Sequence, residues 1–265
     1  MSKPPRILAI AGSDSSGGAG IQADIKTIAM LGGYAMTAIT AVTAQNSQGV
    51  QAIAPLAPDL VRAQIVSCLD DIGADAIKIG MLHDAGIIGE VATALDDVQA
   101  PIVLDPVMIA TSGATLIADD AIAAMKAELF PHAALLTPNL PELEHLAGRT
   151  LRDTGLVREG AAELATAYGC HVLAKGGHTE DDRIIDLLVA PDGTATQFDH
   201  ARIDTPHTHG TGCTLSSAIA TLLGHGQEVE HAVRLARNFV LRAIENAPGF
   251  GEGNGPLGHQ AVRSS

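Results

Sequence analysis

Short apolar segments alternate with longer amphipathic segments along almost the whole chain, and this alternation limits the possible folds more than any other feature. The apolar segments have the length of buried strands, and the segments between them repeat apolar residues every three or four positions, as helices do. Because a strand–helix–strand order joins parallel strands, we predict a three-layer α/β/α fold with a mostly parallel central sheet and helices on both faces. The predicted strands are 6–12, 34–44, 75–80, 101–106, 133–139 and 171–177, with a hairpin at 184–198, and the predicted helices are 20–31, 57–72, 85–95, 119–130, 140–148, 156–169, 211–224 and 228–247.

No linker or low-complexity break divides this pattern, so we expect one domain over residues 1–265. In sheets of this kind ligands bind outside the carboxyl ends of the strands. The loops that follow the predicted strands are therefore the places to look for a site. They read AGSDSSGGAG, AQNSQG, DPVMIATSG, TPNLPE, KGGH and HTHGTGCT.

Charge and composition argue against a nucleic-acid partner. The formal net charge is −14, aromatic residues make up 2% of the chain and there is no Trp. A nucleic-acid surface needs basic patches, and single-stranded binding also needs aromatic stacking platforms. An anionic substrate would have to be held by backbone N–H groups, by a few local cations or by a metal.

An uncharged stretch from Thr27 to Pro58 raises the question of a membrane span. Two glycines, several threonines and the segment AQNSQG interrupt it, so the end of a helix followed by a buried strand explains it better. The chain has three cysteines and no CxxC pair, which disfavours a disulfide framework and a zinc knuckle. We therefore expect no membrane partner and a reducing, cytoplasmic location.

The first glycine-rich loop, AGSDSSGGAG, fits neither common nucleotide fingerprint. A P-loop needs Lys where Gly18 stands, and a dinucleotide site needs an acidic residue about 20 positions further on, where the uncharged stretch supplies none. One open interpretation is a glycine turn that only packs a strand against a helix. The other is a wall for a small, polar, flat ligand, because Asp14, Ser15 and Ser16 add polar groups where the backbone can approach closely.

The loop HTHGTGCT carries the strongest chemical signal. Gly210, Thr211 and Gly212 precede a predicted helix whose first turn contains Cys213. Glycines form anion-binding nests and a helix N-terminus favours negative charge, so we expect a lowered pKa for Cys213 and a phosphoryl-transfer site. The alternatives are a plain glycine N-cap with a buried Cys, and a metal site formed by Cys213 with His207 and His209, although that spacing is not a standard one for zinc.

Three further loops fit a nucleotide and a metal. Asn139 and Glu142 stand three apart at a strand-to-helix junction, Asp105 ends a strand, and Lys175 stands beside glycines. Carboxylates at such ends suit a Mg²⁺ ion that keeps several waters and bridges phosphates. Taken alone, the loops of Asn139, Glu142 and Asp105 fit an N-cap or a solvated turn better, and the loop of Lys175 fits a tight turn equally well.

These segments together resemble the hydroxymethylpyrimidine/phosphomethylpyrimidine kinases of thiamine biosynthesis, in the ribokinase-like superfamily. The resemblance runs nearly end to end and rests on AGSDSSGGAGIQADIKT, TAVTAQNSQGV, IKIGML, VLDPVM, LTPNLPE, KGGH and HGTGCTLSSAIA. It implies a ribokinase-like fold and two successive ATP-dependent phosphorylations, first of 4-amino-5-hydroxymethyl-2-methylpyrimidine and then of its monophosphate. We also expect a homodimer.

The resemblance also implies roles for individual residues. Gln45 is expected to bond the pyrimidine edge, while Gly12, Asp24 and Val107 line its pocket. The segment Gly210–Gly212 forms the anion hole, and Cys213 takes the proton of the substrate hydroxyl. The ATP phosphates and a Mg²⁺ ion are expected near Asn139, Glu142, Lys175 and Asp105, with the metal on Asp105 and Glu142.

Three alternatives remain open at this point. The nearest is a pyridoxal or pyridoxine kinase, which would change the ring pocket more than the chemistry, although GTGC and AQN favour the pyrimidine. A binding protein without catalysis would be expected to lack the base or the metal carboxylates. An NAD-dependent oxidoreductase is disfavoured by the missing ribose-binding acid.

Overall fold

The strands of the chain form one twisted sheet. A computed structural model describes residues 3–108, 117–177 and 182–262. Within them nine strands lie in the order β3-β2-β1-β4-β5-β6-β7-β8-β9. The six central strands, in the spatial order β2-β1-β4-β5-β6-β7, are parallel to their neighbours. The strand β3 at one edge and the strands β8 and β9 at the other pair antiparallel. The strands are β1 (Arg6–Asp14), β2 (Tyr34–Asn46), β3 (Gly49–Pro55), β4 (Ala76–Ile79), β5 (Ile102–Leu104), β6 (Leu135–Leu136), β7 (His171–Ala174), β8 (Arg183–Val189) and β9 (Ala195–Ala201).

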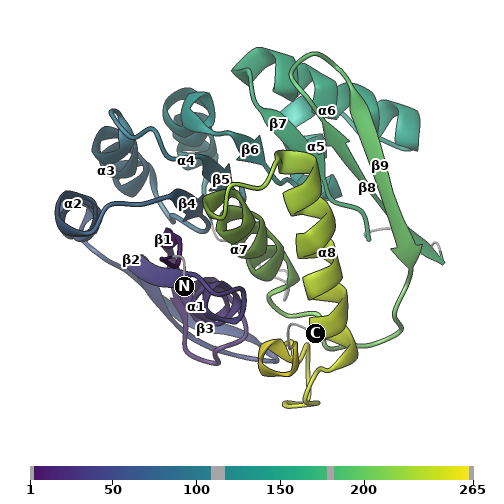
Figure 1. Cartoon of the computed structure of the whole chain (residues 1–265), viewed down its shortest axis with the longest axis horizontal. Coiled ribbons are helices and arrows are strands. Elements are labelled where there is room, and N and C mark those ends of the chain that lie inside the picture. Colours follow the sequence, from purple (N-terminus) through teal and green to yellow (C-terminus); the bar gives the residue numbers. More distant parts are fainter. Residues whose placement is uncertain (1–2, 109–116, 178–181, 263–265) are drawn as a thin grey trace.

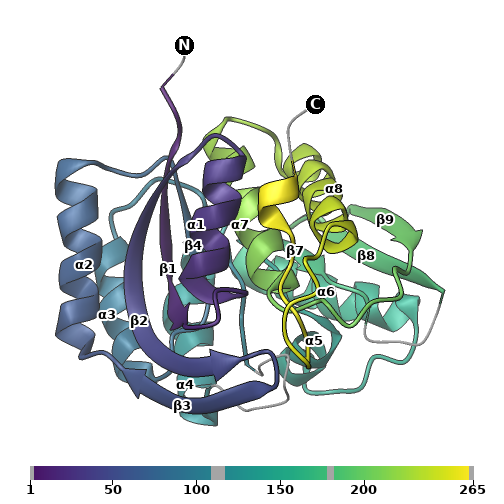
Figure 2. The same cartoon turned by 90° about the horizontal axis from the view of Figure 1, so that it is seen from below.

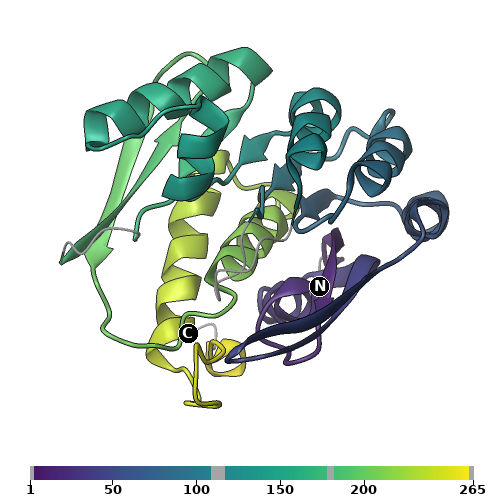
Figure 3. The same ribbon diagram turned by 180° about the vertical axis from the view of Figure 1, so that it is seen from behind.

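Helices cover both faces of the sheet, as predicted (Figures 1 and 3). One face packs against α2 (Pro58–Asp71), α3 (Ala85–Leu95), α4 (Asp119–Ala124), α5 (Leu140–Ala147) and α6 (Thr154–Tyr168), and the other against α1 (Gly20–Met30), α7 (Thr211–Gly224) and α8 (Val229–Glu245). On β1, Leu8 and Ile10 join the first core while Ile7 and Ala9 join the second. Because successive strand side chains point to opposite faces, a strand buried on both sides reads as a continuous apolar run.

Helix bounds follow the predictions closely, and two of them, α3 and α7, agree at both ends. The predicted helix 119–130 begins as α4 but continues as a π-helical turn over Met125–Leu129. None of the helices in the three described segments is long and apolar enough to cross a membrane.

The largest difference from prediction is at the sheet edge that carries β3. The segment AQNSQG was expected to be a loop, but β2 runs through Asn46 and returns as the antiparallel strand β3 (Figure 2). The Asn46 side chain closes the turn, since its Oδ1 accepts hydrogen bonds from the backbone N–H groups of Gln48 and Gly49. The uncharged stretch is thus the end of α1 followed by this curved hairpin.

The strand order places a crevice at the carboxyl end of β1. The chain leaves β1 through α1 on one face to reach β2, and it reaches β4 through α2 on the other face. Such a reversal of connection direction opens a space beside the strand ends, which is where α/β sheets bind ligands.

Candidate active site

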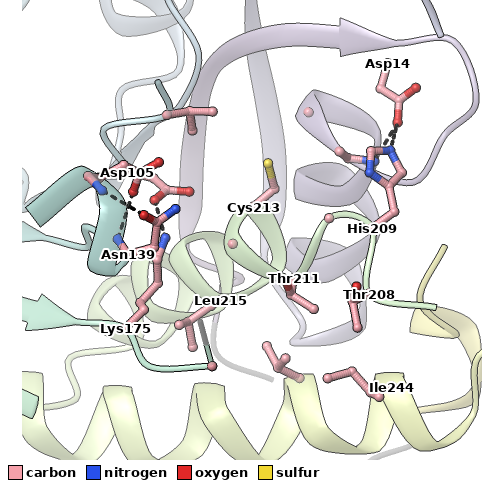
Figure 4. A pocket seen from close by; sticks show the side chains of 18 of the residues that line it. Asp14, Asp105, Asn139, Lys175, Thr208, His209, Thr211, Cys213, Leu215 and Ile244 are labelled. Atoms are coloured by element: carbon pink, nitrogen blue, oxygen red, sulfur yellow. Dashed lines mark hydrogen bonds and ion pairs between the residues drawn. The ribbon is translucent and has the colours of Figure 1, made fainter. Parts of the chain in front are cut away.

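A cavity of about 800 Å³ lies at the carboxyl ends of the strands, between α5 and α7. Figure 4 shows Cys213 between two polar groups, the cluster of Asp105, Asn139 and Lys175 on one side and the pair of Asp14 and His209 on the other. Most residues predicted for the site line this cavity. They are Gly12, Gln45, Asp105, Val107, Asn139, Glu142, Lys175, Gly210, Thr211, Gly212 and Cys213. The KGGH motif is covered only through Gly177, because His178 lies outside the described residues.

The N-terminus of α7 faces the cavity through the segment Gly210–Gly212. Gly210 is the N-cap residue and has a left-handed backbone with φ 88°. A Cβ at this position would collide with the carbonyl oxygen of Gly18, so only glycine lets the two loops meet. Gly210 has no side chain to cap α7, and the Thr211 N–H donates to the Thr208 carbonyl at 3.3 Å. The N–H groups that follow in the first turn are the ones that could bind an anion.

The electrostatics of Cys213 differ from the prediction. We expected a lowered pKa, but burial raises the pKa of this thiol to about 11. The positive charge of Lys78 lowers it in part, while the negative charges of Asp24 and Asp105 raise it further. With a pKa of about 11, this side chain is a protonated thiol at neutral pH. Burial also raises the pKa of Cys170 to about 11 and that of Cys68.

Asp24 does not line the cavity, which corrects the role expected for it. Its side chain is fully buried between α1 and the sheet. Both carboxylate oxygens accept hydrogen bonds from Lys78 Nζ at 3.0 Å, and Ser217 Oγ donates to Oδ1 at 2.6 Å. Burial lowers the pKa of Lys78, but Asp24, and to a lesser extent Cys213 and Asp105, more than offset this and raise it. Both charges of the buried pair lie within electrostatic range of Cys213, where Lys78 lowers the pKa of the thiol and Asp24 raises it.

The first glycine-rich loop uses its own polar groups to fold. Asp14 Oδ1 accepts from the backbone and hydroxyl of Ser16, and Oδ2 accepts from the N–H groups of Gly18 and Ala19. His209 Nε2 lies 2.9 Å from the same Oδ2. Burial raises the pKa of Asp14, but the bonds from His209, Ser16 and Ala19 outweigh it and lower the pKa to about 2. The Asp14 carboxylate is therefore a link between this loop and the one before α7.

Gln45 stands at the end of β2 with its amide in the cavity. Its Oε1 accepts from Thr43 Oγ1 at 3.1 Å, and its Nε2 lies 3.4 Å from His209 Nε2. Its backbone N–H donates to Ser15 Oγ at 2.8 Å, and Ser15 Oγ donates to the Gln45 carbonyl. The glycine-rich loop therefore holds the strand that presents the Gln45 amide.

Asp105, Lys175 and Glu142 form the charged wall opposite. Lys175 Nζ donates to Asp105 Oδ1 at 2.7 Å, and Thr137 Oγ1 donates to the same oxygen at 3.1 Å. Asn139 and Glu142 form a capping box at the start of α5, since each side chain accepts a hydrogen bond from the other residue's backbone N–H. Burial raises the pKa of Glu142 to about 7. The positive charge of Lys175 offsets this rise in part, and the negative charge of Asp105 adds to it.

These carboxylates fit a divalent ion that is shared with phosphates. Among the described residues no group of three His, Cys, Asp or Glu side chains could hold a metal by itself. The metal site considered for His207, His209 and Cys213 is therefore not formed, and His209 is engaged with Asp14 instead. Two carboxylates supply hard oxygen ligands, which suit a divalent cation bound mainly to phosphates and water.

Two buried residues of this site were not recognised from the sequence. Lys78 interrupts the apolar segment DAIKIG, and His209 was considered only as a metal ligand. A charge inside an otherwise apolar strand signals a buried partner, and this signal was present for Lys78. The partner of His209 comes from a segment 195 residues away, and no local pattern indicates that contact.

The model of the family described as phosphomethylpyrimidine kinase matches residues 14–258. The hydroxymethylpyrimidine/phosphomethylpyrimidine kinase of Bacillus subtilis is 45% identical over 261 residues, which cover 97% of this chain and 96% of that protein.

Two solved structures are also similar. The pyridoxal kinase of Bacillus subtilis, determined as an ADP complex, has a TM-score of 0.91 and 37% identity, and the match covers 99% of this chain and 100% of that chain. The phosphomethylpyrimidine kinase of Clostridium difficile has a TM-score of 0.80 and 38% identity, covering 91% and 99%.

Proposed function

We infer the function of this chain from one premise: it belongs to the phosphomethylpyrimidine kinase family. It is a phosphotransferase with the ribokinase-like fold, and it uses ATP to phosphorylate 4-amino-5-hydroxymethyl-2-methylpyrimidine and then the resulting monophosphate in thiamine biosynthesis. The observation that carries this conclusion is the near full-length match, at 45% identity, to a relative that bears both activities in its name. We further propose that residues 1–265 act as one kinase domain.

We propose that the N-terminus of α7 binds the phosphoryl group during transfer. The N–H groups of the Gly210–Gly212 segment would stabilise the charge that spreads over its oxygens. As the substrate oxygen attacks the γ-phosphorus, the bond to the β-phosphate bridging oxygen breaks and ADP leaves. The proton of the attacking hydroxyl goes to Cys213 Sγ in its thiolate form, which the raised pKa makes the minor form at neutral pH. The position of Cys213 in the first turn of α7 supports this role.

On the pyrimidine side, we propose that Gln45 bonds the ring edge while Gly12 and Val107 line the pocket. The Gln45 side-chain Oε1 lies 3.1 Å from Thr43 Oγ1, a hydroxyl that is shared with the Ser13 carbonyl, and its Nε2 lies 3.4 Å from His209 Nε2. These two contacts support a fixed amide orientation. A fixed amide can pair with a ring nitrogen beside an exocyclic amine without a further loss of rotamer freedom on binding.

On the nucleotide side, we propose that Lys175, Asn139 and Glu142 lie at the ATP phosphates and that Asp105 and Glu142 hold Mg²⁺. The ion would neutralise phosphate charge when it is bound. The residues of the chain orient the phosphates, and the pKa of about 7 at Glu142 supports a position that gains from a nearby cation.

The assembly and location of the chain also remain proposals. We propose a homodimer, supported by exposed apolar side chains on β2, where Tyr34 is 51% and Val42 is 47% exposed. Sedimentation of the purified protein tests it. We propose a cytoplasmic location, supported by three free cysteines.

One assay tests the substrate assignment. ADP release is measured with the hydroxymethylpyrimidine, with its monophosphate and with pyridoxal under the same conditions. We expect the highest kcat/KM for the two pyrimidines. The similarity to a pyridoxal kinase structure keeps that activity as the second candidate. A kcat/KM for pyridoxal above both pyrimidine values would reverse the assignment.

A further inference from the structure

A buried ion pair lies at the nucleotide side of the cavity and has no part in the proposed chemistry. Asp186 on β8 and Arg237 on α8 are 6% and 8% exposed, and Arg237 Nε donates to Asp186 Oδ2 at 2.6 Å. Asp186 lines the cavity itself. Burying two charges costs free energy unless further hydrogen bonds satisfy their remaining polar atoms. The second carboxylate oxygen of Asp186 therefore needs a hydrogen-bond donor of its own.

That second oxygen, Asp186 Oδ1, accepts a hydrogen bond from the backbone N–H of Gly176 at 2.7 Å. Gly176 follows Lys175, the residue whose Nζ bonds Asp105. The segment lies so close to β8 that a Cβ at Gly176 would collide with the carbonyl oxygen of Ile185. Lys175 is also fixed from its other side, since its N–H donates to the Pro138 carbonyl at 2.9 Å. The Lys175–Gly176 backbone is thus held from both sides.

Residues other than Asp186 also hold Arg237 in place. Its Nη2 donates to His200 Nδ1 at 2.7 Å, and its guanidinium carbon lies 5.4 Å from the centre of the Phe198 ring. Burial, together with the positive charge of Arg237, lowers the pKa of His200, which keeps its Nδ1 available as an acceptor. Two residues of β9 therefore orient the guanidinium, which in turn orients the Asp186 carboxylate toward Gly176.

We propose that Asp186 and Arg237 are positioning residues for ATP, which fix the Gly176 amide and through it hold Lys175 at the phosphates. The pair links the outer hairpin β8–β9 and α8 to the phosphate side of the cavity. This inference rests on the proposed function only in that the cavity binds ATP. It does not depend on which alcohol accepts the phosphoryl group.

Two double variants separate this role from a general effect on folding. D186L/R237M removes both charges and the acceptor for the Gly176 N–H. D186N/R237M also removes both charges but keeps an oxygen that can accept that bond. D199A removes a carboxylate from the same hairpin, where Asp199 forms an exposed ion pair with Arg183. Binding of a non-hydrolysable ATP analogue and of the pyrimidine is measured by titration calorimetry, and folding is followed by circular dichroism.

We expect D186L/R237M to weaken binding of the ATP analogue by about tenfold or more while pyrimidine binding stays unchanged. D186N/R237M should recover most of that loss, and D199A should bind like the wild type. Equal analogue affinity in the two double variants, or a parallel loss of pyrimidine binding, would overturn the proposal. Failure of the wild type to phosphorylate the pyrimidine would instead refute the proposed function and would leave this comparison intact.

Amide hydrogen exchange of the wild-type protein supplies a second measurement if a double variant does not fold. The bond to Asp186 predicts slow exchange of the Gly176 N–H without nucleotide. Exchange at the rate of an exposed loop amide would contradict the proposed contact.

Discussion

Replacing Cys213 tests whether its thiol accepts the proton of the substrate hydroxyl. Burial, which Lys78 offsets only in part, raises the pKa of this thiol to about 11. At pH 8 about one free enzyme molecule in a thousand therefore carries the thiolate. If the thiolate is the reactive form, kcat/KM for the pyrimidine should rise about tenfold for each pH unit between about pH 7.5 and 9.5.

Two variants give the size of the effect. C213A should fold and bind both substrates but lose about 10²- to 10⁴-fold in kcat, because a general base acts in the transition state. The N–H groups of Gly210–Gly212 remain and leave residual activity. C213D supplies a carboxylate, which ionises at lower pH than a thiol, so it should recover part of the loss and show a flatter pH profile.

The assay couples ADP release to a spectrophotometric signal over this pH range, with ATP saturating and circular dichroism as the control for folding. Wild-type turnover in C213A would show that Cys213 only packs the start of α7. A wild-type kcat/KM that stays constant over the range would contradict a reacting thiolate with a raised pKa.

Four further outcomes are expected. Q45A should raise KM for the pyrimidine about tenfold or more and leave KM for ATP unchanged in steady-state assays, since an unpaired polar edge costs roughly 1–3 kcal/mol; a change in the ATP constant alone would refute the assignment. Excess chelator should abolish turnover, and added Mg²⁺ should restore it. Calorimetry with an ATP analogue should show that the affinity for Mg²⁺ rises as the pH passes about 7, where Glu142 loses its proton. The variant E142Q should not show that rise. K78M should lower the free energy of unfolding in urea by about 3–5 kcal/mol, because it leaves Asp24 buried without its partner, and K78M/D24N should recover most of it. The pKa of Asp14 is lowered to about 2 in the folded protein, so the Asp14 carboxylate adds about 2 kcal/mol to the free energy of unfolding at pH values above its unfolded pKa. This contribution is lost as the pH falls toward 2. Urea unfolding of D14N between about pH 5 and 2 should lack that part of the pH dependence.

Helix positions could be predicted because the signals that set them are local. At α3, the Asp84 side chain accepts a hydrogen bond from the Ile87 N–H, three residues away, so the cap and the apolar spacing fall in one short window. The strand β3 was missed because its residues carry no clear apolar–polar alternation. Its register with β2 is set by pairing and by the Asn46 turn.

The glycine loops of the site were predictable, but the charge environment was less so. Asp24 illustrates a signal that was present and not used: it stands between Ile21 and Ile28 on the buried face of α1, three and four positions away. That spacing predicts a buried carboxylate, which needs a partner such as Lys78. The raised pKa of Cys213 could not be inferred in this way, because it depends on burial and on charges that come from three separate segments.

The partners of the buried carboxylates in the cavity fit the proposal that a chain of net charge −14 binds a polyanion, ATP, at this place. Four buried carboxylates line the cavity. Asp105 pairs with Lys175 and Asp186 with Arg237, while the Asp14 carboxylate lies 2.9 Å from His209 Nε2. Within the described residues Glu142 forms no such ion pair, and burial, with the negative charge of Asp105, raises its pKa to about 7 although Lys175 partly offsets this. A divalent cation that arrives with ATP would therefore stabilise the ionised form of Glu142 at the same time as it shields the phosphates. The acidic surface repels free polyanions over long range. On the proposed assignment, ATP binding depends on a local arrangement of a metal, Lys175 and the N-terminus of α7, and ATP that carries its cation is expected to bind better than ATP without it.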